Sequence, residues 1–201
     1  MRHLLLLTML VCCTLAAGCS DEQQSPRTGQ TLIETNPLSE VKAQVAQDPN
    51  NADAWYHLAD LYERSSMYSE EVDALLKVIS IDPERGPAYP KLGTAYNRLG
   101  KFADAVSQFK KGAKYAPRNA VLYNNMAFSY GKLGKTDEQI AALKKAISIR
   151  PSYATAHYNL GIVYLHQKKK DLALQQYTAL RKIDDTMAEY LKKEIDGGKA
   201  R

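Results

Sequence analysis

The stretch GPAYPKLGTAYNRLGKFADAVSQFKKGAKYAP, residues 86–117, decides the fold of this chain. Small residues at its positions 8 and 20 let two antiparallel helices approach closely, while larger residues at positions 4, 7, 11 and 24 fill the space between helices. A proline at position 32 ends the second helix, because it has no N–H to donate and disfavours helix in the residue before it. These residues are Tyr89 (4), Leu92 (7), Gly93 (8), Tyr96 (11), Ala105 (20), Phe109 (24) and Pro117 (32).

The pattern recurs with a period of 34 residues. The marker residues are Pro49, Pro83, Pro117 and Pro151, together with Tyr62, Tyr96, Tyr130 and Tyr164. This pattern resembles the tetratricopeptide repeat, a helix pair of the same length. The resemblance implies an all-α fold, a right-handed superhelical α-solenoid of four helix pairs. The repeats are expected at about 52–85, 86–119, 120–153 and 154–185.

Helices are expected within and on both sides of these repeats, over a domain of residues 36–195. Asn36-Pro37 predicts the start of an N-terminal capping helix that runs to Gln47. A C-terminal capping helix is expected at 186–195, followed by a tail at 196–201. The first helices of the repeats are expected near 53–65, 87–99, 121–133 and 155–167, and the second helices near 69–81, 103–115, 137–149 and 171–183.

Local signals refine the helix ends and mark exceptions. Gly100 and Gly134 suit helix C-terminal turns. The pairs Thr136 with Gln139 and Thr186 with Glu189 predict capping boxes, and Pro90 stands in the opening turn of a first helix. The departures from the repeat pattern are Glu71 and Gln139 at position 20, Gly112 and Leu180 at position 27, and Asp185 in place of a fifth proline.

The composition is that of a globular protein without catalytic motifs. The chain has 201 residues, 45% hydrophobic and 24% charged, with a formal net charge of +5. Its basic residues are dispersed among acids on helix surfaces, so we expect no nucleic-acid partner. The sequence contains no Gly-rich phosphate loop or nucleophile elbow, and His57, His157 and His166 are not spaced as metal ligands. We therefore expect neither enzyme activity nor a cofactor or metal.

The first 18 residues predict a secretory signal peptide, with one arginine, a short apolar run and then small residues. The sequence Leu15-Ala16-Ala17-Gly18-Cys19 resembles a bacterial lipobox. The resemblance implies lipidation of Cys19, cleavage before it and, with Ser20 next, sorting to the outer membrane facing the periplasm. An ordinary cleaved signal with a free Cys19 is the alternative. Residues 19–35 would form a lipidated N-terminus and flexible tether.

The resemblance also implies a partner-binding groove formed by the first helices. Family positions transferred to this sequence give Tyr56, Lys91, Thr94, Asn97, Arg98, Asn124, Asn125, Phe128, Lys132, Tyr158, Asn159 and Ile162, with Asp60, Arg64, Leu165 and His166 on the same face. Chaperone-docking members hold a terminal carboxylate with lysine and asparagine where this chain has Tyr56 and Asp60. We therefore exclude chaperone docking and expect a segment of another envelope protein to bind.

The expected function is a membrane-anchored periplasmic scaffold or adaptor for assembly of an envelope complex. The chain is similar to two kinds of lipoprotein, those that assist secretins of pili or secretion systems and those that recruit peptidoglycan-processing enzymes. The architecture slightly favours the pilus and secretin kind. Regulation of an envelope enzyme is an alternative, and binding of a glycan or small molecule is a more distant one, because four repeats form an open trough.

Overall fold

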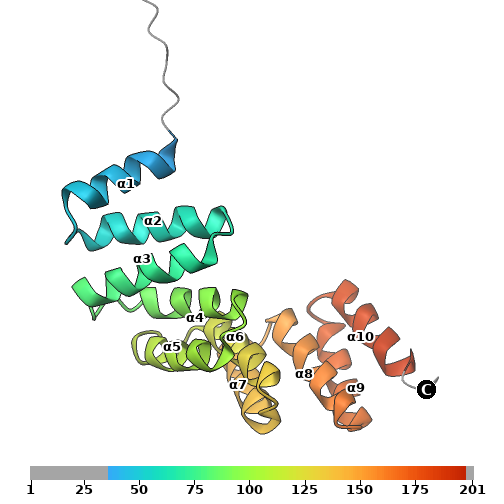
Figure 1. The fold of residues 1–201 in the computed structure, drawn as a ribbon. Helices are drawn as coiled ribbons and strands as arrows, with labels where there is room; N and C mark the ends of the chain where they lie inside the picture. Colours follow the sequence, from blue (N-terminus) through green and yellow to red (C-terminus); the bar gives the residue numbers. More distant parts are fainter. Residues whose placement is uncertain (1–35, 198–201) are drawn as a thin grey trace, which may run out of the picture. The chain divides into compact units, whose positions relative to one another are not determined.

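The computed structural model describes residues 36–197. The predicted signal peptide, Cys19 and the tether lie outside the described residues, as do residues 198–201 at the end of the predicted tail. The described part consists of ten α-helices and contains no strand (Figure 1). The helices are α1 (Pro37–Gln47), α2 (Ala52–Arg64), α3 (Tyr68–Ile81), α4 (Ala88–Arg98), α5 (Phe102–Tyr115), α6 (Ala120–Lys132), α7 (Thr136–Ile149), α8 (Ala154–His166), α9 (Lys170–Leu180) and α10 (Asp185–Gly197).

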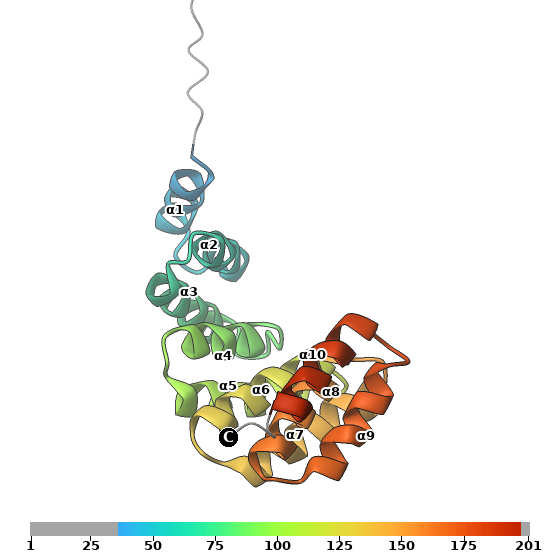
Figure 2. The same ribbon diagram turned by 90° about the vertical axis from the view of Figure 1, so that its right-hand side faces the viewer.

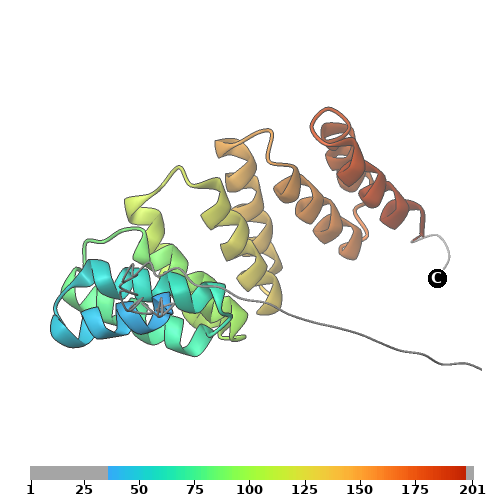
Figure 3. The same cartoon turned by 90° about the horizontal axis from the view of Figure 1, so that it is seen from above.

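The helices form four pairs with one further helix at each end, which confirms the predicted all-α solenoid. The pairs are α2/α3, α4/α5, α6/α7 and α8/α9, and the second helix of each of the first three pairs also packs on the first helix of the next pair (Figures 1 and 3). Helix α1 covers α2. Helix α10 packs against both α8 and α9 (Figure 2).

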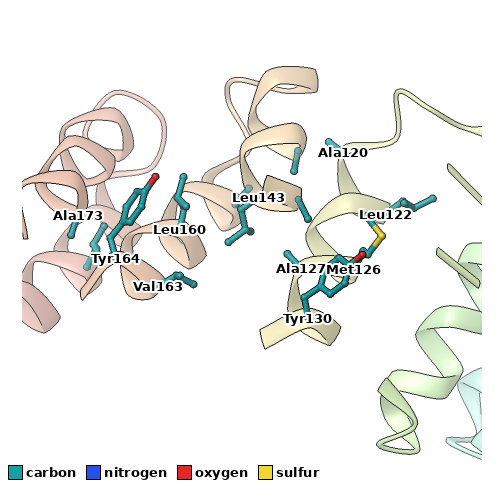
Figure 4. Close-up of a cluster of buried hydrophobic side chains, with 14 of the residues drawn as sticks. Ala120, Leu122, Met126, Ala127, Tyr130, Leu143, Leu160, Val163, Tyr164 and Ala173 are labelled. Carbon is teal, nitrogen blue, oxygen red and sulfur yellow. The ribbon is translucent and has the colours of Figure 1, made fainter. Parts of the chain in front are cut away.

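The apolar repeat positions form the core. Leu75, Phe109 and Leu143 occupy the same place in three successive repeats, and each is at most 1% exposed. The buried residues form two clusters, one from α1 to α4 and one from α5 to α10, and Tyr96 packs against both. Figure 4 shows the second cluster, with Tyr130 of α6 and Tyr164 of α8 among its side chains.

The large residue at position 4 also fixes the start of its repeat. In the first, second and fourth repeats, its polar side-chain atom reaches the carbonyl oxygen of the proline that ends the preceding unit, six residues earlier. The contacts are Trp55 Nε1 to Pro49 O (3.0 Å), Tyr89 Oη to Pro83 O (2.6 Å) and His157 Nε2 to Pro151 O (2.9 Å). Because a carbonyl oxygen only accepts, Nε2 of His157 carries a proton. His157 is thus a packed core residue.

The turn inside each repeat uses a left-handed residue. Gly100 and Gly134 have φ of 73° and 70°, which confirms their predicted role at helix C-termini. The equivalent residues of the other two repeats, Ser66 and Lys168, adopt φ of 58° and 57° without being glycine. A side chain in this conformation costs about 1 kcal/mol or more.

Asparagine caps begin three helices, whereas both predicted capping boxes are wrong. The Asn36 side chain accepts from Leu38 N–H ahead of Pro37, as predicted. Helix α7 begins at Thr136 itself, and no side chain caps it. At α10, the Asp184 carboxylate accepts from Met187 N–H at 2.9 Å, the role expected of Thr186. The other asparagine caps are Asn51 of α2 and Asn119 of α6.

Two departures from the repeat pattern are compensated by a neighbour. A Cβ on Gly112 would lie 2.8 Å from the ring of Pro90, so the missing side chain makes room for the proline. A Cβ on Gly131 would lie 2.6 Å from the amide of Gln139. A glycine on one helix thus accommodates the unusual residue on its neighbour.

Candidate functional site

The first helices α2, α4, α6 and α8 are joined by polar side chains. Between α2 and α4, Lys91 forms ion pairs with both Asp60 (2.7 Å) and Glu63. Burial lowers the pKa of Lys91, but the two carboxylates outweigh burial, and the net pKa lies above its ordinary value. The predicted groove residue Lys91 is therefore committed to its own chain.

Amide side chains also connect the later first helices to one another. Between α4 and α6, the Ser129 hydroxyl donates to Asn97 Oδ1 at 2.7 Å. Between α6 and α8, Asn159 Nδ2 donates to Asn124 Oδ1 at 3.0 Å, and Asn124 is buried. Three of the predicted groove amides thus bind one another or a neighbouring helix.

Helices α6, α7 and α8 surround a pocket of about 430 Å³, the α6–α8 pocket. Phe128 and Ile162 give it apolar walls, and Lys132 and His166 give it basic ones. Oε1 of Gln167, which also lines this pocket, is buried without a hydrogen-bond partner within the described region. Its full lining is Ala127, Phe128, Gly131, Lys132, Thr136, Gln139, Leu143, Asn159, Ile162, Val163, His166 and Gln167.

A second pocket of about 430 Å³, the α4–α6 pocket, is lined by Thr94, Asn97, Arg98, Asn125 and Phe128. The two pockets share Phe128, whose side chain is 48% exposed. Phe102 of α5 contacts the Phe128 ring edge to face, with centroids 6.1 Å apart. A half-exposed aromatic ring that contacts Phe102 and borders two pockets is a surface suited to an apolar side chain of another molecule.

The structure divides the predicted groove residues into two sets. Those that line a pocket are Thr94, Asn97, Arg98, Asn125, Phe128, Lys132, Asn159 and Ile162. Tyr56, Lys91, Asn124 and Tyr158 line neither pocket. Tyr56 instead has Arg85 above its ring, at 4.8 Å from the centroid.

Sequence reasoning missed the contribution of α7 and of the turn after α8. Thr136, Gln139 and Gln167 line the α6–α8 pocket although they lie outside the first helices. One signal was present, because Gln139 stands at a position where the repeat pattern has a small residue. A polar side chain there reaches past Gly131 into the pocket.

The equivalent position in the first repeat holds Glu71, which is only 1% exposed. Its Oε1 has no hydrogen-bond partner among the described residues. Burial, followed by repulsion from Glu63, raises the pKa of Glu71 from 4.5 to about 7, while attraction to Lys91 and Arg98 opposes the rise. Lys91 pairs with Asp60 and Glu63 rather than with Glu71.

Within residues 36–197, no cluster of three or more His, Cys, Asp or Glu side chains is arranged to hold a metal ion. The helices described here are also too short or too polar to cross a membrane. The two pockets that share Phe128 form the candidate functional site.

Comparisons with known proteins identify the repeat. The family model "Tetratricopeptide repeat" matches residues 52–85 and 87–119, and the model "TPR repeat" matches residues 130–168. Together these matches cover just over half of the chain. No curated protein sequence matches at a significant level.

Solved structures show the same fold at low identity. The crystal structure of MamA aligns with a TM-score of 0.72 and 23% identity, over 76% of this chain and 90% of that chain. YrrB, a TPR protein with an unusual peptide-binding site, aligns with a TM-score of 0.69 and 22% identity, over 78% and 81%. A thermophilic TPR protein in Thermus thermophilus aligns with a TM-score of 0.60 and 22% identity, over 82% and 89%. The chain belongs to the tetratricopeptide repeat proteins.

Proposed function

We propose that this chain is a non-catalytic adaptor that binds a segment of a partner protein along the face of its first helices. The observation that carries the proposal is Phe128, which stands half-exposed between two adjoining pockets. An extended segment would place an apolar side chain against Phe128 and its backbone near Asn125, an amide that both donates and accepts.

The similarity to YrrB supports this proposal, because that protein has a peptide-binding site on the same fold. The openness of the first-helix face adds a physical argument. An enclosed cavity is the usual site for a small molecule or glycan, whereas two shallow pockets along a row of helices suit a chain.

The proposed setting is the bacterial envelope. We propose that Cys19 is lipidated, that the protein is anchored in the outer membrane facing the periplasm, and that it assists assembly of a type IV pilus or secretin complex. Recruitment of peptidoglycan-processing enzymes is the alternative. These proposals rest on the sequence Leu15-Ala16-Ala17-Gly18-Cys19 and on the repeats.

Photo-crosslinking in cells tests the adaptor proposal. A photoreactive amino acid is placed at Asn125 or Phe128, with exposed Lys77 of α3 as the control, and the adducts are identified by mass spectrometry. We expect one partner to be captured from the two first-helix positions but not from Lys77. Equal capture from all three positions, or none from Asn125 and Phe128, would contradict the proposal.

The captured partner also decides between the two pathways, since a secretin subunit and a murein enzyme are different adducts. Membrane anchoring has a separate test, in which Cys19→Ser is followed by cell fractionation. We expect the variant to leave the membrane fraction. If it still pellets with the outer membrane, lipidation of Cys19 is not what holds the protein there.

A further inference from the structure

A basic residue ends each first helix of the four repeats. Arg64, Arg98, Lys132 and His166 stand 34 residues apart, each in the last turn of its helix. We refer to these four residues as the basic row. Arg98 lines the α4–α6 pocket, and Lys132 and His166 line the α6–α8 pocket. The basic row therefore lies along the first-helix face, where the partner segment is proposed to bind.

The helix dipole alone does not explain this row. A cation in the last turn is favourable for any helix. Yet the second helices α3, α7 and α9 have no basic residue in their last turn, and among second helices only α5 has one, Lys114. All four first helices thus end in a basic residue, whereas only one of the four second helices has a basic residue in its last turn.

The first-helix face is also free of acidic residues in its last three helices. Helices α4, α6 and α8 contain no aspartate or glutamate, and neither pocket is lined by one. Within the described part of the chain, Arg98 and Lys132 form no ion pair; each lies over an aromatic ring, of Tyr68 and Phe128 respectively. Lys91 differs, because it is paired with Asp60 and Glu63. Glu71 attracts Arg98 electrostatically but forms no ion pair with it, so the positive charge beside Phe128 is not neutralised by direct pairing within the described residues.

We propose that the partner segment is acidic and that the basic row binds its carboxylates on both sides of an apolar residue seated on Phe128. This inference rests on the proposed function and adds the chemistry of the partner. Because Arg98 and Lys132 line the two pockets that share Phe128, one carboxylate should lie on each side of the apolar residue. Phe128 and Ile162 favour a polypeptide over a phosphate polymer, which would leave these apolar walls uncovered.

The test uses fluorescent synthetic peptides and fluorescence anisotropy on the purified full chain. The first peptide has a central leucine with a glutamate three residues to either side, and the second has glutamine in place of both glutamates. We expect the first peptide to bind about tenfold more tightly than the glutamine peptide, with an affinity that falls as salt rises.

Matched charge variants locate the effect. The double variant Arg98→Gln/Lys132→Gln should bind the glutamate and glutamine peptides equally. The control Lys110→Gln/Lys144→Gln removes the same charge from exposed sites of α5 and α7 and should keep the tenfold preference. Thermal melting checks that both variants fold.

Several results would overturn the proposal. They are equal binding of the two peptides by the unaltered chain, loss of the preference in the control variant, and no binding of the glutamate peptides even at millimolar concentration. A general polyanion surface would be shown instead if duplex DNA or anionic lipid vesicles competed as strongly as the peptide and Phe128→Ser did not change peptide binding. A crosslinked partner segment that lacks acidic residues would refute this inference while the adaptor function stands.

Discussion

The first-helix face differs between the first and third repeats although their backbones follow one pattern. Position 9 holds Asp60 in the first repeat and Phe128 in the third, and position 20 holds Glu71 and Gln139. In the first repeat the acids draw in Lys91, and the surface is occupied by the chain's own ion pairs. In the third, an exposed ring and a pocket remain open. The fold thus determines where the residues of each repeat lie. The residues at positions 9 and 20 decide whether this surface is occupied by the chain's own ion pairs or is available to a partner.

The largest effect is expected in the cores beneath the two surfaces. Leu75→Ala and Leu143→Ala delete equivalent buried side chains, and each should lower the free energy of unfolding by about 2–5 kcal/mol. Because contacts in a solenoid are mostly between neighbours, each variant should loosen its own half more. Hydrogen exchange measured by mass spectrometry should show greater deprotection of α2 and α3 for Leu75→Ala, and of α6 and α7 for Leu143→Ala. Identical exchange patterns would mean that the two clusters unfold as one unit.

The second prediction exchanges the residues at position 20. The folded-state pKa of Glu71 is about 7, above the 4.5 of the ordinary group, so the folded protein retains a proton that the unfolded chain releases. Its contribution to stability is therefore present below about pH 4.5 and is lost as pH rises to about 7. Glu71→Gln should remove this loss and stabilise the protein at pH 8 by at most about 3.5 kcal/mol, since one pKa unit corresponds to about 1.4 kcal/mol.

The converse variant Gln139→Glu should destabilise the protein at pH 8 by less, because Gln139 is partly exposed and lines an open pocket. Denaturant unfolding of both variants between pH 4 and 8 measures the difference. A pH profile for Glu71→Gln that parallels that of the unaltered chain would show that Glu71 is ionised in the folded state.

The third prediction exchanges the residues at position 9. Phe128→Asp would give the third repeat the residue of the first and place a carboxylate between Arg98 and Lys132. We expect binding of the crosslinked partner segment to weaken at least tenfold, about 1.4 kcal/mol, in fluorescence anisotropy. Leu76→Asp, which places the same charge at an exposed apolar site of α3 outside both pockets, is the control and should bind normally. Unchanged affinity of Phe128→Asp would remove Phe128 from the site.

The smallest effect concerns helix starts. Asn51 and Asn119 cap the equivalent helices α2 and α6 with bonds of 2.9 and 3.1 Å. Replacing either by alanine should cost about 1 kcal/mol, the usual value of an asparagine cap. Thr136→Ala should cost almost nothing, because no side chain caps α7. Thermal unfolding compares the three variants, and a large loss for Thr136→Ala would restore the predicted capping box.

The sequence by itself determined the repeats, the helix pairs and the closing helices. The physical reason is that each repeat needs small residues at two contacts, large ones between them and a proline at the end, and these are local requirements with a fixed spacing. The same spacing placed Phe128, Arg98 and Lys132 on the first helices. Capping was less predictable, since Asp184 and Thr186 are both plausible caps and only the backbone path selects one.

Only the tertiary structure decided which groove residues are available. Asn124 and Asn159 look equally suited to bind a peptide in the sequence, but they hydrogen-bond to each other across two helices. In the sequence Lys91 looks like a free cation, but in the structure it forms ion pairs with Asp60 and Glu63 of α2. Such pairings join residues about 30 positions apart. They depend on how two repeats pack against each other, and the sequence of a single repeat does not contain that information.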